Sequence, residues 1–156
     1  MDLAVDMLWT ITDVYFHGGK FDGAIKTEEM VILIDPAQSD AYSSASWLLD
    51  SGEKPDEAKS LLEMEVRQGI PEFEPYYELG MWHYDHKESA AAIECFGKSI
   101  RFPAPPYVIR MLAHAYEQAG KLDDSIATWE RIIRHNPDDA VAKTNLERVR
   151  KAKAGG

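Results

Sequence analysis

Residues 92–99 match a relaxed phosphate-binding loop. Ala-Ile-Glu-Cys-Phe-Gly-Lys-Ser has the spacing of a P-loop, with Ala92 in place of the first glycine. A P-loop binds phosphate because a flexible loop after a strand lets successive backbone N–H groups wrap the oxygens. Here apolar residues recur at helical spacing, and Ala92 and Phe96 are expected to pack inside a helix pair. We therefore interpret the match as a coincidence and expect no nucleotide.

Three histidines are candidates for metal binding or proton-linked chemistry. His83 and His86 are three residues apart, a spacing that could place two imidazoles on one metal ion beside a carboxylate. Two ligands do not make a site, however, and His83 is expected in a packing position while His86 begins a turn. His114 is expected among carboxylates, where protonation would make ligand binding depend on pH. We expect no metal.

The chain shows no pattern typical of covalent catalysis. Cys95 is the only cysteine, which excludes an internal disulfide and a cysteine-built zinc site. It falls in the middle of an expected helix without a basic neighbour to activate it. There is no Gly-x-Ser-x-Gly motif, and a solvated acidic face explains the 27 Asp and Glu residues better than a general acid–base pair. We expect neither an enzyme nor a cofactor.

The elements that would position these residues repeat along the chain. Pro36 and Pro137 each follow an apolar, helix-like run, and they are separated by three steps of 34, 34 and 33 residues. Stepping the chain by these intervals aligns an apolar column, two columns of small residues, a mixed column and a bulky column that Glu28 interrupts. In that order they are Ile11, Ala45, Leu79, Leu112; Thr12, Ser46, Gly80, Ala113; Ala24, Ala58, Ala92, Ser125; Tyr15, Leu49, His83, Tyr116; and Leu62, Phe96, Trp129.

Turn-forming residues divide each unit into two halves. They lie at 17–20, 51–55, 85–88 and 119–121, and apolar residues recur at three- and four-residue spacing on both sides. Each unit is therefore predicted to be helix–turn–helix, and strand-like alternation is absent. The second unit departs most from the pattern, because Gly52 comes one residue early.

This pattern resembles the tetratricopeptide repeat (TPR) family, whose repeat of about 34 residues carries Trp-x2-Leu-Gly-x2-Tyr, then Ala-x3-Phe, then Pro. The third unit fits best, with Leu79-Gly80 followed by Ala92 and Phe96. The resemblance implies an all-α fold, a right-handed superhelix (solenoid) of about four repeats. We expect one domain over 1–156 with repeats at about 5–38, 39–72, 73–105 and 106–139. A C-terminal capping helix is expected at 140–153, begun by Asp138 or Asp139 and basic at its end.

The resemblance also implies a concave wall lined by the first helix of each repeat. Helical spacing selects residues on that wall that combine aromatic and methionine anchors with carboxylates. The candidate peptide-binding residues are Trp9, Asp13, Phe16, Trp47, Asp50, Glu74, Tyr77, Glu78, Met81, Tyr84, Arg110 and His114. Exposed aromatic and methionine side chains are typical of binding surfaces, although packing between neighbouring helices would place the same residue types there.

The lining predicts the class of ligand. The family's carboxylate clamp is absent, since its places hold Trp9, Asp13, Ser44, Tyr77 and Glu78 with only Arg110 basic nearby. We expect a non-catalytic module that binds a peptide or helical segment with basic and apolar side chains. Two alternatives stay open. One is a homo-oligomeric scaffold that pairs through the apolar flank of the first repeat, formed by Leu3, Met7 and Leu8. The other is a secretion-type chaperone holding an unfolded client segment.

Charge and hydropathy exclude other partners. The net charge is −10, with −13 in residues 1–100 and +3 in residues 101–156. This acidity disfavours nucleic acid and anionic membranes. The basic C-terminal run complements the dipole of the capping helix, and binding of RNA or phosphate by this run is the alternative interpretation. The apolar stretches are too short to cross a bilayer, and the start of the chain is acidic where a secretory signal would be basic. We expect a cytoplasmic protein.

Overall fold

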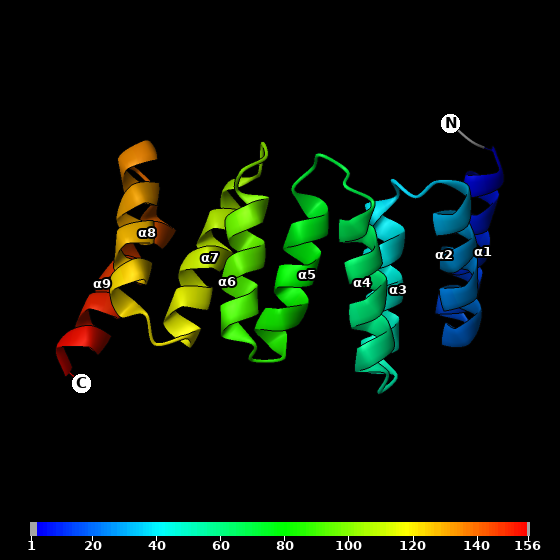
Figure 1. The fold of residues 1–156 in the computed structure, drawn as a ribbon, viewed down its shortest axis with the longest axis horizontal. Helices are drawn as coiled ribbons and strands as arrows, with labels where there is room; N and C mark the ends of the chain where they lie inside the picture. Colours follow the sequence, from blue (N-terminus) through cyan, green and yellow to red (C-terminus); the bar gives the residue numbers. More distant parts are fainter. Residues whose placement is uncertain (1–2, 156) are drawn as a thin grey trace. The chain divides into compact units, whose positions relative to one another are not determined.

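The computed structural model describes residues 3–155, and every regular element within that range is an α-helix. Figure 1 shows them as successive antiparallel pairs joined by short turns. Their bounds are α1 Leu3–His17, α2 Phe21–Ile34, α3 Ser39–Ser51, α4 Pro55–Arg67, α5 Glu74–Asp85, α6 Ser89–Ser99, α7 Pro106–Gln118, α8 Leu122–His135 and α9 Ala140–Gly155.

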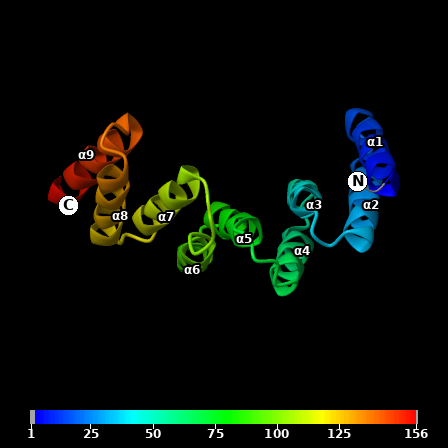
Figure 2. The ribbon, with the colours of Figure 1, turned by 90° about the horizontal axis from the view of Figure 1, so that it is seen from above.

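The chain divides into two compact units, one ending at Pro71 and the other beginning at Glu72. In the first unit α1 packs on α2, α2 on α3 and α3 on α4. In the second unit α5 to α9 pack in the same consecutive manner, and Figure 2 shows α8 and α9 side by side at the C-terminal end. Each expected repeat thus contains one helix pair, and α9 closes the second unit, which confirms the all-α architecture of four repeats and a capping helix.

Small residues lie where the helices come closest. Every member of the column Ala24, Ala58, Ala92 and Ser125 is fully buried. The second small column, from Thr12 to Ala113, is buried as well. The shared burial of both columns confirms the helical spacing inferred from the sequence, because only one face of each helix can be buried against its pair.

The bulky column forms the centre of each later repeat. Leu62, Phe96 and Trp129 are almost completely buried. Phe96 belongs to one core cluster with Ala92 and Leu112, and Trp129 belongs to another that includes the buried residues of α9. In the first repeat the equivalent residue is Glu28, which is only 1% exposed. The column is therefore structural in all four repeats, and in one of them it is filled by a carboxyl group.

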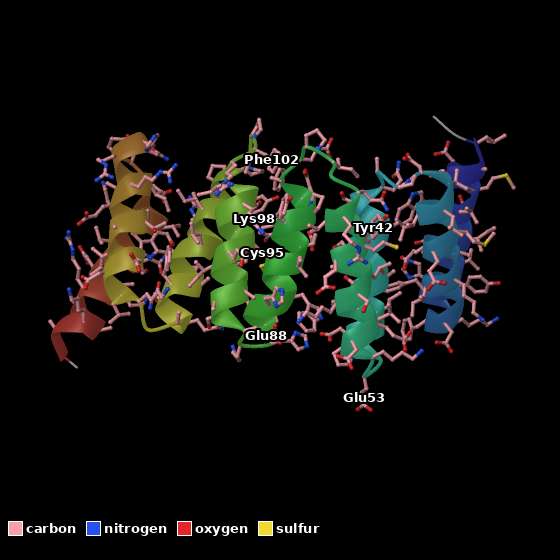
Figure 3. The ribbon with its side chains drawn as sticks, in the orientation of Figure 1. Tyr42, Glu53, Glu88, Cys95, Lys98 and Phe102 are labelled. Carbon is pink, nitrogen blue, oxygen red and sulfur yellow. The ribbon has the colours of Figure 1, made fainter. Side chains whose placement is uncertain are left out.

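The turn inside each repeat has one backbone geometry. Gly19, Glu53, Lys87 and Gly120 are one repeat step apart, and each has a φ between 63° and 71°. The next N–H donates to a carbonyl five residues back in every repeat, over 2.8–2.9 Å, which is the closing hydrogen bond of a Schellman motif. In the second repeat the left-handed position is held by Glu53, and Gly52 lies one residue before it. Figure 3 shows Glu53 in the turn after α3.

Ile11 differs from the other members of its apolar column. It is 40% exposed, whereas Ala45, Leu79 and Leu112 are buried. The reason is the position of its helix: α3 and α7 pack on a preceding helix, while α1 packs mainly on α2. Within residues 3–155 no helix covers this side of α1.

Helix α9 is fixed at both ends. The Asp139 carboxylate accepts the Ala142 N–H over 2.9 Å, which confirms the predicted cap. The basic residues at the other end form ion pairs with the preceding two helices. These pairs are Arg148 with Glu117, Arg150 with Glu130, and Lys153 with Asp123. Its basic run therefore serves packing as well as the helix dipole.

The left-handed turn positions generate a stability prediction. Glu53→Gly should raise the free energy of unfolding by about 0.5–1 kcal/mol, because a side chain with positive φ is strained and glycine is not. The reverse change, Gly120→Ala, should lower it by about 1 kcal/mol. Urea unfolding followed by circular dichroism measures both. Shifts of the same sign in the two variants would contradict the assigned geometry.

Candidate functional site

Five of the predicted site residues lie in the first unit. Trp9, Asp13 and Phe16 are on α1, and Trp47 and Asp50 are on α3. Phe16 and Trp47 are brought together, with ring centroids 6.4 Å apart. Trp9 and Asp50 are half-buried, and Asp13 is exposed.

An additional aromatic residue completes this group. Phe21, at the start of α2, has its ring centroid 5.8 Å from that of Phe16. Phe16, Phe21 and Trp47 are 39%, 49% and 59% exposed, although the Phe16 ring lies against each of the other two. We call these three residues the aromatic triad. Sequence reasoning missed Phe21 because it considered the first helix of each repeat only; its position directly after a Gly-Gly turn was the available signal.

A pocket of about 560 Å³ lies beside the triad. It is formed by the two intra-repeat turns of the first unit, by the start of α2 and by the end of α3. Trp47 and Phe21 line it, and the remaining wall contains Ile25, Leu48 and Leu49 with the polar residues Lys20, Asp22 and Lys54. This volume is in the range of ordinary ligand pockets, so one or two apolar side chains of a partner fit in it.

The surroundings of the pocket are acidic. Residues 3–71 contain five Lys and Arg against thirteen Asp and Glu, a net charge of −8. Asp13 contacts His17 over 3.2 Å, and Lys54 is 3.9 Å from Glu57, both on the surface. Surface pairs of this kind contribute little stability. The net charge of −8 already counts Lys54, so the unit keeps a negative field that attracts a basic partner.

The aromatic and methionine site residues of the second unit are packed against the core. Tyr77, Met81 and Tyr84, all on α5, lie against the buried cluster that contains Phe96. The Tyr77 ring centroid is 5.2 Å from that of Tyr107 and 6.0 Å from that of Phe96. Burial raises the pKa of the Tyr77 hydroxyl. These side chains are half-buried and contribute to packing, and their role in binding stays a prediction.

The charged site residues of the second unit have partners within it. Arg110 donates to Asp139 over 2.6 Å, and the hydrogen bond from Ala142 together with this arginine lowers the pKa of the Asp139 carboxyl. His114 stacks edge-on against Trp129, 5.1 Å between centroids, and lies 3.4 Å from Glu117. Glu74 and Glu78 are half-buried on α5. Arg110 thus connects α7 to the cap of α9, and His114 connects α7 to α8.

The histidine and the P-loop-like segment that the sequence singled out both take part in packing within the second unit. His83 is buried and 2.6 Å from Glu88, across the turn between α5 and α6 where Figure 3 shows Glu88. The P-loop-like segment is part of helix α6, with Ala92 and Phe96 buried, as expected.

Among residues 3–155 no three His, Cys, Asp or Glu side chains gather as metal ligands. No helix in the same range is both long and apolar enough to span a bilayer.

Glu28 is the one charged member of the bulky column. It accepts a hydrogen bond from the Ser44 hydroxyl over 2.6 Å through Oε1, while Oε2 is buried without a hydrogen-bond partner. Burial raises the pKa of the Glu28 carboxyl, and the Ser44 hydrogen bond offsets part of the rise. A buried carboxylate with one satisfied oxygen destabilises the first repeat at neutral pH.

Comparison with solved structures shows the fold. The crystal structure of MamA superposes with a TM-score of 0.75 over 99% of this chain and 85% of its own, at 23% identity. YrrB, described as a TPR protein with an unusual peptide-binding site, gives 0.67 over 92% of this chain and 74% of its own, at 17% identity. TTC0263, a thermophilic TPR protein of Thermus thermophilus, gives 0.69 over 93% of this chain and 80% of its own, at 15% identity.

No protein-family model matches the chain, and no curated protein sequence matches it either. The likeness is therefore one of structure at low sequence identity. The chain has the tetratricopeptide repeat fold, as its repeat pattern predicted.

The buried carboxyl group generates a pH-dependent prediction. Glu28→Leu should raise the free energy of unfolding by about 1–2 kcal/mol at pH 7, because it removes a buried charge and restores an apolar column. The folded-state pKa of Glu28 is raised, so the wild-type carboxyl protonates as pH falls and loses its charge-burial penalty. The advantage of the variant should therefore shrink toward pH 4.

Glu29→Leu is the matched control, because Glu29 is exposed on the same helix and carries the same charge. Urea midpoints at pH 7, 5.5 and 4 give the comparison. An advantage of Glu28→Leu that is equal at all three pH values, or that Glu29→Leu reproduces, would show that charge burial is not the cause.

Proposed function

We propose that this protein is a non-catalytic interaction module that binds a peptide or helical segment with apolar and basic side chains. The observation that carries the proposal is the aromatic triad of Phe16, Phe21 and Trp47, exposed beside a pocket of about 560 Å³. Large aromatic side chains left in water are costly unless a partner covers them. They are also the residues that dominate binding energies at protein interfaces.

Two further observations support this ligand class. The unit that holds the triad has a net charge of −8 over residues 3–71, which attracts lysine and arginine and repels acidic segments. The TPR fold is also that of YrrB, which is described as having a peptide-binding site. Trp47 and Phe21 would hold apolar side chains, while Asp13 and Asp50 on neighbouring turns of α1 and α3 would attract the basic ones. In the second unit the proposed contacts are of the same chemical type, with Glu74 and Glu78 for basic side chains and Met81 and Tyr84 for apolar ones.

A displayed library of random twelve-residue peptides tests the proposal directly. The wild-type chain should enrich sequences that combine Leu, Phe or Trp with Lys or Arg. Synthetic copies of the enriched peptides should bind Trp47→Ser/Phe21→Ser at least tenfold more weakly, as measured by fluorescence anisotropy, because hot-spot aromatics commonly contribute more than 1 kcal/mol each.

Leu33→Ser is the matched control, since Leu33 is a highly exposed apolar residue of the same unit that does not line the pocket. It should bind as the wild type does. Enrichment of acidic peptides, or equal binding by the double variant, would refute the proposed site. Unchanged circular dichroism in all variants shows that folding is intact.

Self-association is a second candidate function, favoured by a separate surface. Met7, Ile11 and Val14 on α1 are 40–66% exposed. Their equivalents one repeat later, Ala41, Ala45 and Leu48, are buried, and so are Val108, Leu112 and Ala115 of the fourth repeat. Leu33 likewise stands where the other repeats have Arg67, Arg101 and Arg134. The first repeat is thus apolar at positions that elsewhere are covered or charged, and a second copy would cover them.

Sedimentation between about 5 and 500 μM distinguishes this candidate. If copies pair through α1, the mass should rise with concentration, and Met7→Glu/Val14→Glu should stay monomeric because buried unpaired carboxylates disfavour the interface. Ser60→Glu, exposed on α4, which packs on α3, should associate as the wild type does. A wild-type chain that is monomeric throughout excludes self-association.

A further inference from the structure

A second pocket, of about 310 Å³, lies wholly within the second unit. It is formed by the loop between α6 and α7, the start of α7, the end of α8 and the start of α9. Its apolar wall includes Ile100, Phe102, Pro105, Ile109 and Ile132. Its ionisable side chains are Arg110, Arg131, His135 and Asp139. The combination differs from the acidic surroundings of the aromatic triad, so it calls for a different ligand.

One carboxylate and one arginine of this pocket neutralise each other. Asp139 accepts hydrogen bonds from Arg110 over 2.6 Å through Oδ2 and from the Ala142 N–H over 2.9 Å through Oδ1. The first helical N–H groups of α9 add positive potential to this carboxylate. Asp139 is therefore already paired, and it repels an incoming anion much less than a bare carboxylate would.

One charged side chain remains, that of Arg131. The Arg131 side chain is exposed, and its guanidinium forms no ion pair with any residue that the structure describes. His135, one turn later on α8, donates from Nδ1 to the Arg131 carbonyl oxygen over 2.9 Å. This hydrogen bond fixes the ring at the rim of the pocket. An unpaired guanidinium at the rim of an apolar pocket is suited to a carboxylate.

The apolar wall is held rigidly. Phe102, which Figure 3 shows in the loop after α6, stacks on Tyr76 of α5 with ring centroids 5.9 Å apart and planes 11° from parallel. Pro105 and Pro106 restrict the backbone at the start of α7. A wall that is ordered before binding loses little entropy when a ligand enters.

We propose that this pocket binds an apolar group that carries a carboxylate. The apolar group enters between Phe102, Ile109 and Ile132, and the carboxylate pairs with Arg131 at the rim. Either a small carboxylic acid or the C-terminal residue of a polypeptide has this chemistry. The site is independent of the aromatic triad, because every residue that lines it lies between positions 100 and 139.

Titration of the full ¹⁵N-labelled chain with N-acetyl-L-leucine and with N-acetyl-L-leucinamide tests the proposal. The two probes have the same shape, and only the first has a carboxylate. The acid should shift the amide resonances of Ile109 and Ile132 and bind about tenfold more tightly than the amide, because a charge-assisted hydrogen bond contributes that much. Arg131→Gln should remove this difference.

Arg134→Gln is the matched control, since Arg134 is exposed on the same helix, has the same charge and does not line the pocket. It should leave the preference for the acid intact. Equal binding of acid and amide, no shift at Ile109 and Ile132, or an equal loss in Arg134→Gln overturns the proposal. A pentapeptide that ends in leucine with a free carboxylate then distinguishes a polypeptide C-terminus from a small carboxylic acid as the ligand. Binding of this peptide supports a chain end, and its failure where N-acetyl-L-leucine binds supports a small acid.

Discussion

Close approach of helices through small side chains is the constraint on which the rest of this structure depends. Gly80 shows how tight the approach is, because a Cβ added there would stand 2.8 Å from a ring carbon of Phe96. The bulky residue at the centre of the third repeat fits only because the facing position has no side chain. The fully buried column from Ala24 to Ser125 extends the same arrangement to all four repeats. Once the pairs are this close, their turns must be short, and the four left-handed turn residues follow.

This constraint explains why the fold could be predicted from the sequence. Close contacts within a helix pair are made by residues near one another in the chain, so the small and bulky columns appear as a period of 34 residues. The turn inside each repeat was located from the turn-forming residues that recur with the same period. The position of the left-handed residue could not be predicted in the second and third repeats. Glu53 and Lys87 adopt it because the pair geometry requires it, although neither residue type prefers positive φ.

The side-chain partners depended on contacts that no local pattern encodes. Arg110 was expected to face a ligand, but the cap of α9 brings Asp139 within 2.6 Å of it. Glu117 similarly receives Arg148 from α9, at 2.7 Å, as well as His114 from its own helix. The contacts with Asp139 and Arg148 join residues about thirty positions apart, and they exist only because α9 packs on α8. The sequence placed these residues on the correct helix, and tertiary packing determined what they touch.

The first repeat inverts the usual distribution of polarity, and this inversion connects its packing to its proposed function. Inside, Thr12 and Thr27 share a hydrogen bond of 2.6 Å, and Glu28 occupies the place of a bulky apolar residue. Outside, Met7 and Leu33 are exposed, as are Phe16 and Phe21 of the aromatic triad. Moving apolar area from the core to the surface lowers the stability that the repeat gains from folding alone. The same area is then available to a partner, so association recovers hydrophobic free energy that folding leaves unused. A binding surface built in this way couples occupancy to the stability of the repeat that carries it.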